Sequence, residues 1–447
     1  MTNDMTSGNP VKLIIRFMIP MCLGNIFQQF YNIADSIIAG QFLGVNALAA
    51  IGSTGSLIFL VMGWLNGLTS GFSIWVAQWF GGKKLNRMRH FLAMSIYICV
   101  AFVVVMTIGL LFANEPILRL MNSPEEILSD IKAYMAIIYA GLAVTCAYNA
   151  LAAVLRALGD SKSPLYFLII SAFLNVVLDI AFIVIFHMGV EGCAYATVIA
   201  QAVSALLCLI YINKKFPVLK LKKDDFHFSW FTIRKLLSLG IPMGLQFSIT
   251  AIGTIIVQGA INVYGAIYMA GFSAAGKIQN IICTVFVSFG ATIATYVGQN
   301  RGAGKMDRVK KGVYLTQAMV LVSSVVIMAV IHFLGKYMIL IFVDPSETEV
   351  LHAAEIYFRT VSWCYPFLGS IYLYRNALQG LGYGLVPMLG GVFELAARAL
   401  IVALVAGSAS FAGVCMSDPA AWIAALIPLV PYYFWIMRKS FSINSAG

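Results

Sequence analysis

The sequence is poor in charge, in histidine and in cysteine patterns that bind metals. Asp, Glu, Lys and Arg together make up 11% of the 447 residues. The five histidines are not clustered with acids, and the eight cysteines are scattered without a Cys-x-x-Cys spacing. Isolated cysteines in apolar segments are typical of small core residues. The sequence therefore predicts no cofactor and no structural or redox metal centre.

Motifs of familiar enzymes are also missing. There is no His-Glu-x-x-His and no Gly-x-Ser-x-Gly. The nearest approach to a phosphate-binding loop, Gly298 to Met306, lacks both the glycine spacing and the final Ser or Thr. These absences argue against a membrane enzyme.

Apolar residues dominate what is present, at 61% of the chain with a mean hydropathy of +0.89. A membrane-spanning helix needs about 20 mostly apolar residues. Twelve such stretches are centred near Ile26, Met62, Ala101, Leu142, Leu174, Ala200, Ile252, Phe286, Ser323, Ser370, Ala397 and Ile427. The first is too long for a cleaved signal peptide. We therefore predict an all-α polytopic membrane protein with 12 transmembrane helices.

The distribution of Lys and Arg predicts the orientation. With the N-terminus inside, most basic residues fall on cytoplasmic segments such as 83–89, 214–235 and 301–311. Outer loops hold few basic residues and many acids. The positive-inside rule then makes both termini cytoplasmic, in the plasma (inner) membrane of the cell. The net charge of +11 reflects this topology and the anionic inner leaflet, so membrane lipids and not nucleic acid are the expected partners.

The chain contains an internal duplication. Ile19-Pro20-Met21 recurs as Ile241-Pro242-Met243, and Leu158-Gly159 recurs as Leu381-Gly382. The offsets are close to 222 residues, and each half holds six spans, so both halves enter the membrane from the same side. We expect a six-helix lobe over 1–213, a basic cytoplasmic linker over 214–230 and a second lobe over 231–447. Transporters of this construction bind at the interface of their halves and alternate access.

Asp35 lies deep in the first apolar run. An Asp at the centre of a spanning helix costs roughly 2.5 to 3.5 kcal/mol, so it indicates a functional site. Gln28, Tyr31 and Asn32 share one helix face with it. The repeat has no acid there, because Asp35 corresponds to Val257.

The fifth span carries a second polar face. Asn175 and Asp179 are four residues apart and point the same way, with Ser171 on the same stripe. Thr197 of the sixth span is a third contributor. We expect the two faces to meet inside the N-terminal half. Simple hydrogen bonding between helices is the alternative, which suits Asn and Gln better than two acids.

Two such carboxylates can bind and release a proton near neutral pH, because burial and a like-charged neighbour favour the protonated form. Sodium is the alternative, held by the oxygens of Asp35, Asn175, Asp179 and Thr197. A cation bound better by one conformation shifts the equilibrium between inward-open and outward-open states. Pro20 is a point where the first helix can bend.

These segments resemble the multidrug and toxic compound extrusion (MATE) family. The similar segments are Pro20-Met21, Gln28 to Asp35, Leu43-Gly44 with Ala47 to Gly52, Val76-Ala77-Gln78, Leu155 to Asp160, and Asn175 with Asp179. Their order within a duplicated six-helix unit is specific, and the similarity covers essentially the whole chain.

The resemblance implies a cation-coupled antiporter whose two six-helix lobes form a V around a central cavity. By position, the N-lobe proton or sodium site of the DinF-like branch corresponds to Asp35, Gln28, Tyr31, Asn175, Asp179 and Thr197, and its bending proline to Pro20. The NorM-like branch has an acid early in its seventh helix, and the stretch from Gln246 to Val257 has none. We therefore expect proton coupling, with sodium as the alternative, in a chain that acts as a monomer.

Cationic amphipathic compounds are the expected substrates, because acids and aromatic rings in an apolar cavity suit them. The candidate cavity residues are Phe27, Phe30, Tyr148, Asn149, Lys277, Glu394 and Arg398. Glu394 and Arg398 are spaced for an ion pair on one helix, so a structural pair and a substrate contact both remain open. A flippase for lipid-linked oligosaccharides or polysaccharides, from the same broad superfamily, is the alternative function. Such proteins tend to present a strongly basic cavity, whereas acids and bases are balanced in these spans.

Overall fold

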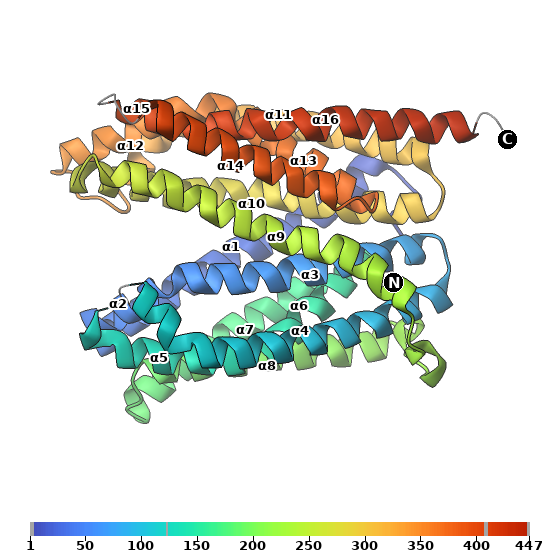
Figure 1. The fold of residues 1–447 in the computed structure, drawn as a ribbon, viewed down its shortest axis with the longest axis horizontal. Helices are drawn as coiled ribbons and strands as arrows, with labels where there is room; N and C mark the ends of the chain where they lie inside the picture. The colour runs from blue at the N-terminus through green and yellow to red at the C-terminus, as the bar shows by residue number, and fades with distance from the viewer. Residues whose placement is uncertain (1–3, 122–123, 406–409, 445–447) are drawn as a thin grey trace. The chain divides into compact units, whose positions relative to one another are not determined.

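The computed structural model describes residues 4–121, 124–405 and 410–444, where all regular structure is helical (Figure 1). The helices are α1 (Pro10–Leu43), α2 (Val45–Ser53), α3 (Gly55–Gly81), α4 (Leu85–Leu120), α5 (Glu125–Ala140), α6 (Leu142–Ala157), α7 (Lys162–Ile180), the π-helix η1 (Ala181–Ile185), α8 (Val190–Lys215), the 3-10 helices η2 (Pro217–Leu219) and η3 (Lys223–Phe226), α9 (Trp230–Asn262), α10 (Ala266–Gly302), α11 (Met306–Ile339), α12 (Thr348–Val361), η4 (Ser362–Cys364), α13 (Tyr365–Gly380), α14 (Leu385–Val405), α15 (Phe411–Cys415) and α16 (Ser417–Asn444).

The predicted all-α polytopic architecture is confirmed. Within the described ranges, ten helices are long and apolar enough to cross a membrane. An eleventh span is obtained if α5 and α6, which meet at an angle of 48°, count as one broken span. The span predicted around Ser370 falls on α13, whose 16 residues are shorter than a bilayer requires. That twelfth span remains a prediction.

The turns repeat along the chain as the sequence does. Gly44 and Gly265 both have a φ of 88° and directly precede α2 and α10, respectively. Gly159 and Gly382 have φ values of 85° and 81° in the turns before α7 and α14. Because only glycine adopts this left-handed region without strain, the duplication has preserved the backbone turns as well as the helices.

The chain divides into two compact units, and α1 and α9 each contribute to both. The first unit contains Leu23–Gly244, and the second contains Met5–Cys22 together with the chain from Leu245 onward. The two changes of unit, after Cys22 and after Gly244, are 222 residues apart and so are equivalent positions of the repeat. Each repeat therefore begins its first long helix among the helices of the other unit.

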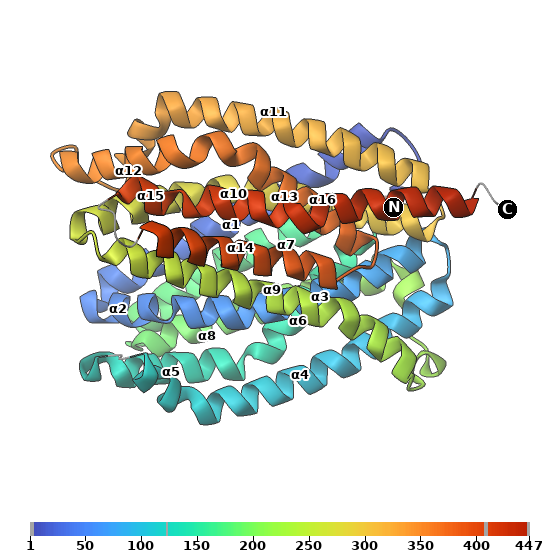
Figure 2. The same cartoon turned by 45° about the horizontal axis from the view of Figure 1, so that its top comes forward.

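In the first unit, α6 packs against both α3 and α8, α4 packs against α3 and α5, and α5 and α7 each pack against α8 (Figure 2). The beginning of α9 approaches α3 closely, since a methyl group on Gly67 would lie 2.5 Å from the Gly244 nitrogen. The segment before α9 is also fixed in place. Arg89 Nε donates to Asp225 Oδ2 (3.2 Å), and Asp225 in turn accepts from the Lys222 nitrogen (2.8 Å). The basic segment predicted as a linker is thus partly packed on the first unit.

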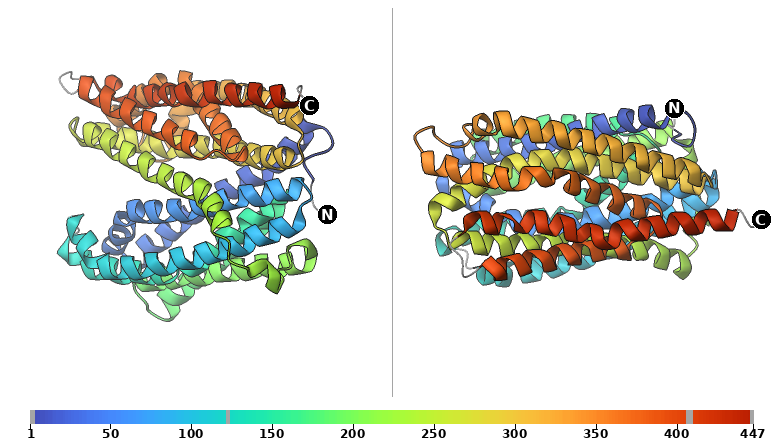
Figure 3. Two further views of the ribbon diagram at one scale, coloured as in Figure 1. Left: turned by 45° about the vertical axis from the view of Figure 1, so that its right-hand side comes forward. Right: turned by 90° about the horizontal axis from the view of Figure 1, so that it is seen from above.

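In the second unit, α10 runs against α11, α12 and α13, and α14 packs along α16 (Figure 3). The contact between α10 and α11 is tight, because a methyl group on Gly312 would collide with the Tyr296 ring. The apolar core includes Phe286, Tyr296 and Tyr365, all fully buried.

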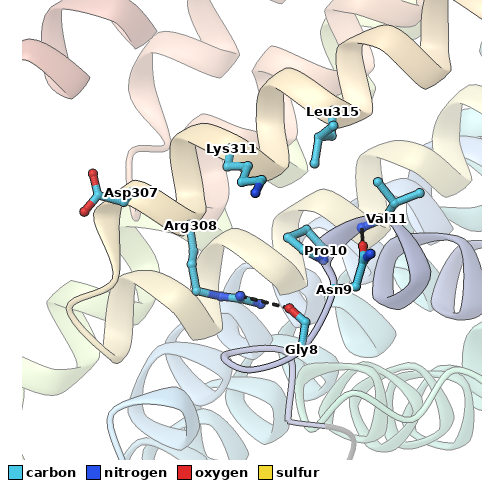
Figure 4. A pocket seen from close by; sticks show the side chains of 8 residues that line it. All are labelled: Gly8, Asn9, Pro10, Val11, Asp307, Arg308, Lys311 and Leu315. Carbon is cyan, nitrogen blue, oxygen red and sulfur yellow. Dashed lines mark hydrogen bonds between the residues drawn. The ribbon is translucent and has the colours of Figure 1, made fainter.

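The N-terminal segment Met5–Gly8 is bound to the turn between α10 and α11 of this second unit. The Met5 nitrogen donates to Gln299 Oε1 (2.9 Å), and the Met5 oxygen accepts from Asn300 Nδ2 (3.1 Å). Arg308 donates to the carbonyl oxygens of Met5 (3.2 Å) and Gly8 (3.0 Å). Beside these contacts lies a pocket of about 530 Å³ lined by Gly8, Asn9, Pro10, Val11, Asp307, Arg308, Lys311 and Leu315 (Figure 4).

Candidate functional site

Asp35 of α1 and Asp179 of α7 come together inside the first unit. Both are buried, with 9% of Asp35 and none of Asp179 exposed, and their carboxyl groups lie within hydrogen-bonding reach of each other. Cys193 of α8, also fully buried, completes the cluster. One carboxylate oxygen of each Asp and the Cys193 Sγ all lie within 4.8 Å of one another. Asp35 Oδ1 and Asp179 Oδ1 are buried without a hydrogen-bond partner.

Asn175 and Thr197 form the polar shell of this pair. Asn175 precedes Asp179 by one helical turn, and its Nδ2 donates to Asp179 Oδ2 (3.0 Å) while its Oδ1 accepts from the Thr197 nitrogen (3.2 Å). The opposite amide orientation would place oxygen against oxygen, so we adopt this one. The Tyr31 hydroxyl donates to Thr197 Oγ1 (3.3 Å), which links α1 to α8.

The helix that carries Asp179 changes form directly after it. α7 ends at Ile180, and the following residues continue as the π-helix η1. π-type turns inside a helix frequently occur at functional sites. Ser171, two turns before Asp179, donates to the Ala200 carbonyl oxygen (2.8 Å) and so joins α7 to α8.

Three further residues of α1 were assigned roles from the sequence. Gln28 is exposed and takes part in none of the contacts above. The side chain of Asn32 lies outside the described part of the structure. Pro20, the expected bending point, is buried within an unbroken α1 in the second unit, three residues before Leu23, where the helix enters the first unit.

Cys193 is the member of the cluster that sequence reasoning missed. A signal was available, because Cys193 precedes Thr197 by four residues and therefore lies on the same face of α8. Cysteine in an apolar helix is usually an ordinary core residue, so the spacing alone did not distinguish it.

The second unit has a different polar centre at the equivalent place. Arg398, the counterpart of Asn175, lies in α14 with its Nε donating to Asp418 Oδ1 (3.2 Å). Its Nη1 is 3.6 Å from Glu394 Oε2, so the pair expected on one helix is present. Glu394 also forms a buried ion pair with Arg375 of α13. Two acids and two bases thus form one network, in which only Asp418 is half-buried and the other three are buried. The Tyr357 hydroxyl completes it by donating to Asp418 Oδ2 (3.1 Å).

The other candidate cavity residues occupy varied positions. Phe27 and Phe30 are exposed, at 41% and 62%, while Tyr148 and Asn149 are half-buried. Lys277 is exposed, with its Nζ 5.0 Å from the centre of the Phe342 ring. Their contribution to a substrate cavity remains a prediction.

Comparison with known proteins is consistent with this arrangement. The sequence matches the MatE family model over residues 20–181 and 242–414, two segments that begin 222 residues apart like the internal repeat. It is 30% identical over 390 residues to the probable multidrug resistance protein YpnP of Bacillus subtilis, covering 85% of this chain and 84% of that protein. It is 23% identical over 382 residues to the probable multidrug resistance protein NorM of Thermotoga maritima, covering 85% of this chain and 82% of that protein.

Solved structures share the fold. One described as an outward-facing multidrug resistance MATE family transporter of the MOP superfamily superposes with a TM-score of 0.91 at 21% identity, covering 98% of both chains.

Proposed function

The chain belongs to the MatE family of membrane transporters, and we propose that it is a proton-coupled antiporter that exports organic cations or drugs by alternating access. The observation that carries this proposal is the buried pair of Asp35 and Asp179, which have carboxylate oxygens within 4.8 Å of each other. As a transporter, the protein is not an enzyme. We further propose that it lies in the plasma membrane, with an orientation that follows the positive-inside rule and makes both termini cytoplasmic.

Electrostatic repulsion supports a proton at this pair. Two unit negative charges within 4.8 Å repel each other by at least about 3 kcal/mol at an effective dielectric constant of about 20. A shared proton removes this repulsion, as in other close carboxyl pairs. A conformation that opens the pair to water releases the proton more readily than one that buries it. The proton gradient can then drive the exchange between states.

Sodium is the alternative coupling ion. Asp35, Asp179, Asn175 and Thr197 offer the oxygen atoms that such an ion needs. The third side of the cluster is the Cys193 sulfur, however, which is a poor ligand for hard cations. The composition of the cluster therefore favours the proton.

Cationic substrates are favoured by the charge balance. The four charges of the second unit, on Arg375, Glu394, Arg398 and Asp418, cancel among themselves. Asp35 and Asp179 have no basic partner in the contacts described for them, and aromatic side chains add cation-binding faces. The relatives named above are multidrug resistance proteins, and none of those names supports a flippase.

Efflux in membrane vesicles tests the proposal. Export of a fluorescent organic cation is driven by an imposed pH gradient or by an imposed sodium gradient, for the parent protein, Asp35→Asn and the control Asp224→Asn, an exposed acid of the cytoplasmic segment. We expect pH-driven efflux in the parent and in the control, and its loss in Asp35→Asn. Undiminished coupled efflux by Asp35→Asn would refute the mechanism, and efflux driven by sodium alone would replace the proton with sodium.

A further inference from the structure

The buried thiol of Cys193 lies beside two buried carboxyl groups in the first unit. Cys193 comes from α8, Asp35 from α1 and Asp179 from α7. We propose that these three side chains form a binding site for a thiophilic divalent cation of the Zn²⁺ and Cd²⁺ type, and that the bound ion blocks transport. The inhibitory part rests on the proposed role of the acid pair in coupling.

The distances suit such an ion after a small contraction. Three atoms that lie within 4.8 Å of one another fit inside a circle whose centre is at most about 2.8 Å from each of them. Zinc binds sulfur at about 2.3 Å and carboxylate oxygen at about 2.0 to 2.2 Å. Each ligand atom therefore needs to move by less than about 1 Å, which rotation of the side chains can supply. A catalytic-type zinc site also has three protein ligands, and water takes the fourth position.

Two buried oxygen atoms are free to accept a cation. Asp35 Oδ1 and Asp179 Oδ1 are buried without a hydrogen-bond partner. A buried unpaired carboxylate oxygen costs free energy, because it has lost its water and gained nothing in exchange. A cation at the centre of the cluster would satisfy both carboxylates.

Hydrogen bonds beside the cluster already orient the Asp179 carboxylate and join α7 to α8. Asn175 Nδ2 donates to Asp179 Oδ2, and the Asn175 Oδ1 accepts from the Thr197 nitrogen of α8. Hydrogen bonds of this kind fix the direction of a ligating carboxylate and raise metal affinity.

Occupation of the site has a mechanical consequence. A divalent ion replaces the thiol proton and the proton shared by the carboxyl groups, so that two protons leave for each ion that binds. The ion then links α1 to α7 and α8 by strong bonds, and it occupies both carboxylates that the coupling ion requires. Transport should stop without any change to the substrate site.

One other place in the first unit can attract a thiophilic ion. The thiols of Cys99 in α4 and Cys146 in α6 lie within hydrogen-bonding reach of each other. Among the described residues, no Asp, Glu or His joins these two thiols in a three-residue cluster. Cys146→Ala is therefore the matched control, because it removes a buried thiol from the same unit while leaving the three-residue cluster intact.

Cadmium titration of the purified full-length protein in detergent tests the site without any transport. Binding is followed by the ultraviolet charge-transfer absorption of the cadmium–thiolate bond and by the rise in the thermal unfolding midpoint. For the parent and for Cys146→Ala we expect saturable tight binding at the cluster, reversed by a chelator. For Cys193→Ala and Asp179→Asn, loss of a ligand should weaken it by at least about tenfold.

Inhibition is then measured in vesicles, with each variant compared with its own rate in the absence of cadmium. Cadmium should inhibit the parent and Cys146→Ala, and Cys193→Ala should need a cadmium concentration at least about tenfold higher for the same inhibition.

Equal binding by the parent and Cys193→Ala, or loss of binding in Cys146→Ala alone, would overturn the site. Because binding is read in detergent, an Asp35→Asn protein that still couples efflux would refute the proposed function and leave the site standing. Tight binding without inhibition would overturn the block.

Discussion

Neutralising Glu394 should destabilise the second unit strongly. The carboxylate is 5% exposed and neutralises Arg375, and it lies 3.6 Å from Arg398 Nη1. At 3.6 Å and an effective dielectric constant of about 20, the attraction between two unit charges is about 4 to 5 kcal/mol. Breaking a buried pair from one side typically costs about 3 to 5 kcal/mol, because the partner remains as an uncompensated charge. Glu394→Gln should therefore lower the free energy of unfolding by about 3 kcal/mol or more.

The assay is the thermal unfolding midpoint in detergent, with Glu355→Gln as the control. Glu355 also pairs with an arginine four residues later on its helix, but that arginine side chain is 79% exposed and the N–O distance is 3.8 Å. An exposed pair of this kind contributes about 0.5 kcal/mol or less. Equal midpoints for Glu394→Gln and Glu355→Gln would refute the reasoning.

A double variant distinguishes the structural role of Glu394 from substrate binding. Replacing both partners, as Arg375→Met with Glu394→Leu, removes the pair without leaving Arg375 uncompensated, while Arg398 retains Asp418. Such replacements are often close to neutral for stability. We expect the midpoint to recover and efflux to persist. A stable double variant that no longer exports substrate would assign the Arg375–Glu394 pair to the substrate site.

Two further substitutions probe packing in each unit. Gly312→Ala should lower the free energy of unfolding by about 1 to 3 kcal/mol, because the added methyl group collides with the ring of Tyr296. Gly276→Ala is the control: its methyl group meets open space, so it should be neutral or stabilising in the same thermal assay. Asp225→Asn weakens the hydrogen bonds that hold the segment before α9. If this lowers the free energy of opening that segment by about 1 to 2 kcal/mol, trypsin should cut at the lysines of the segment roughly 5 to 30 times faster. Asp224→Asn is the control for this digestion, and equal rates for the two variants would contradict the packed arrangement.

The acid pair was predictable because its cost in a membrane is large. Few side chains other than Asp35 and Asp179 make a spanning helix expensive, and helix periodicity places Asn175 beside Asp179. Their meeting follows from a physical requirement, since each polar face must avoid lipid. Gln28 shares the periodicity but stays exposed, because an amide at a helix surface meets no comparable penalty.

The partners of the second network were less accessible to sequence reasoning. Helix spacing identified Arg398 as a partner for Glu394, but the ion pair with Arg375 depends on how α13 packs beside α14. Asp418 lies in the first turn of α16, where an acid is common because it stabilises the helix dipole. Nothing in the local pattern marked it as the partner of a buried arginine.

The N-terminal segment has a consequence for the order of folding. The partner of the Met5 nitrogen, Gln299, lies 294 residues later in the chain. At roughly 5 to 20 residues per second, the ribosome needs roughly 15 to 60 s to make that partner. The start of α9, by contrast, joins helices that are already complete. The first unit can therefore finish folding before residues 245–447 are synthesised, while residues 5–22 wait for partners that the ribosome has yet to make.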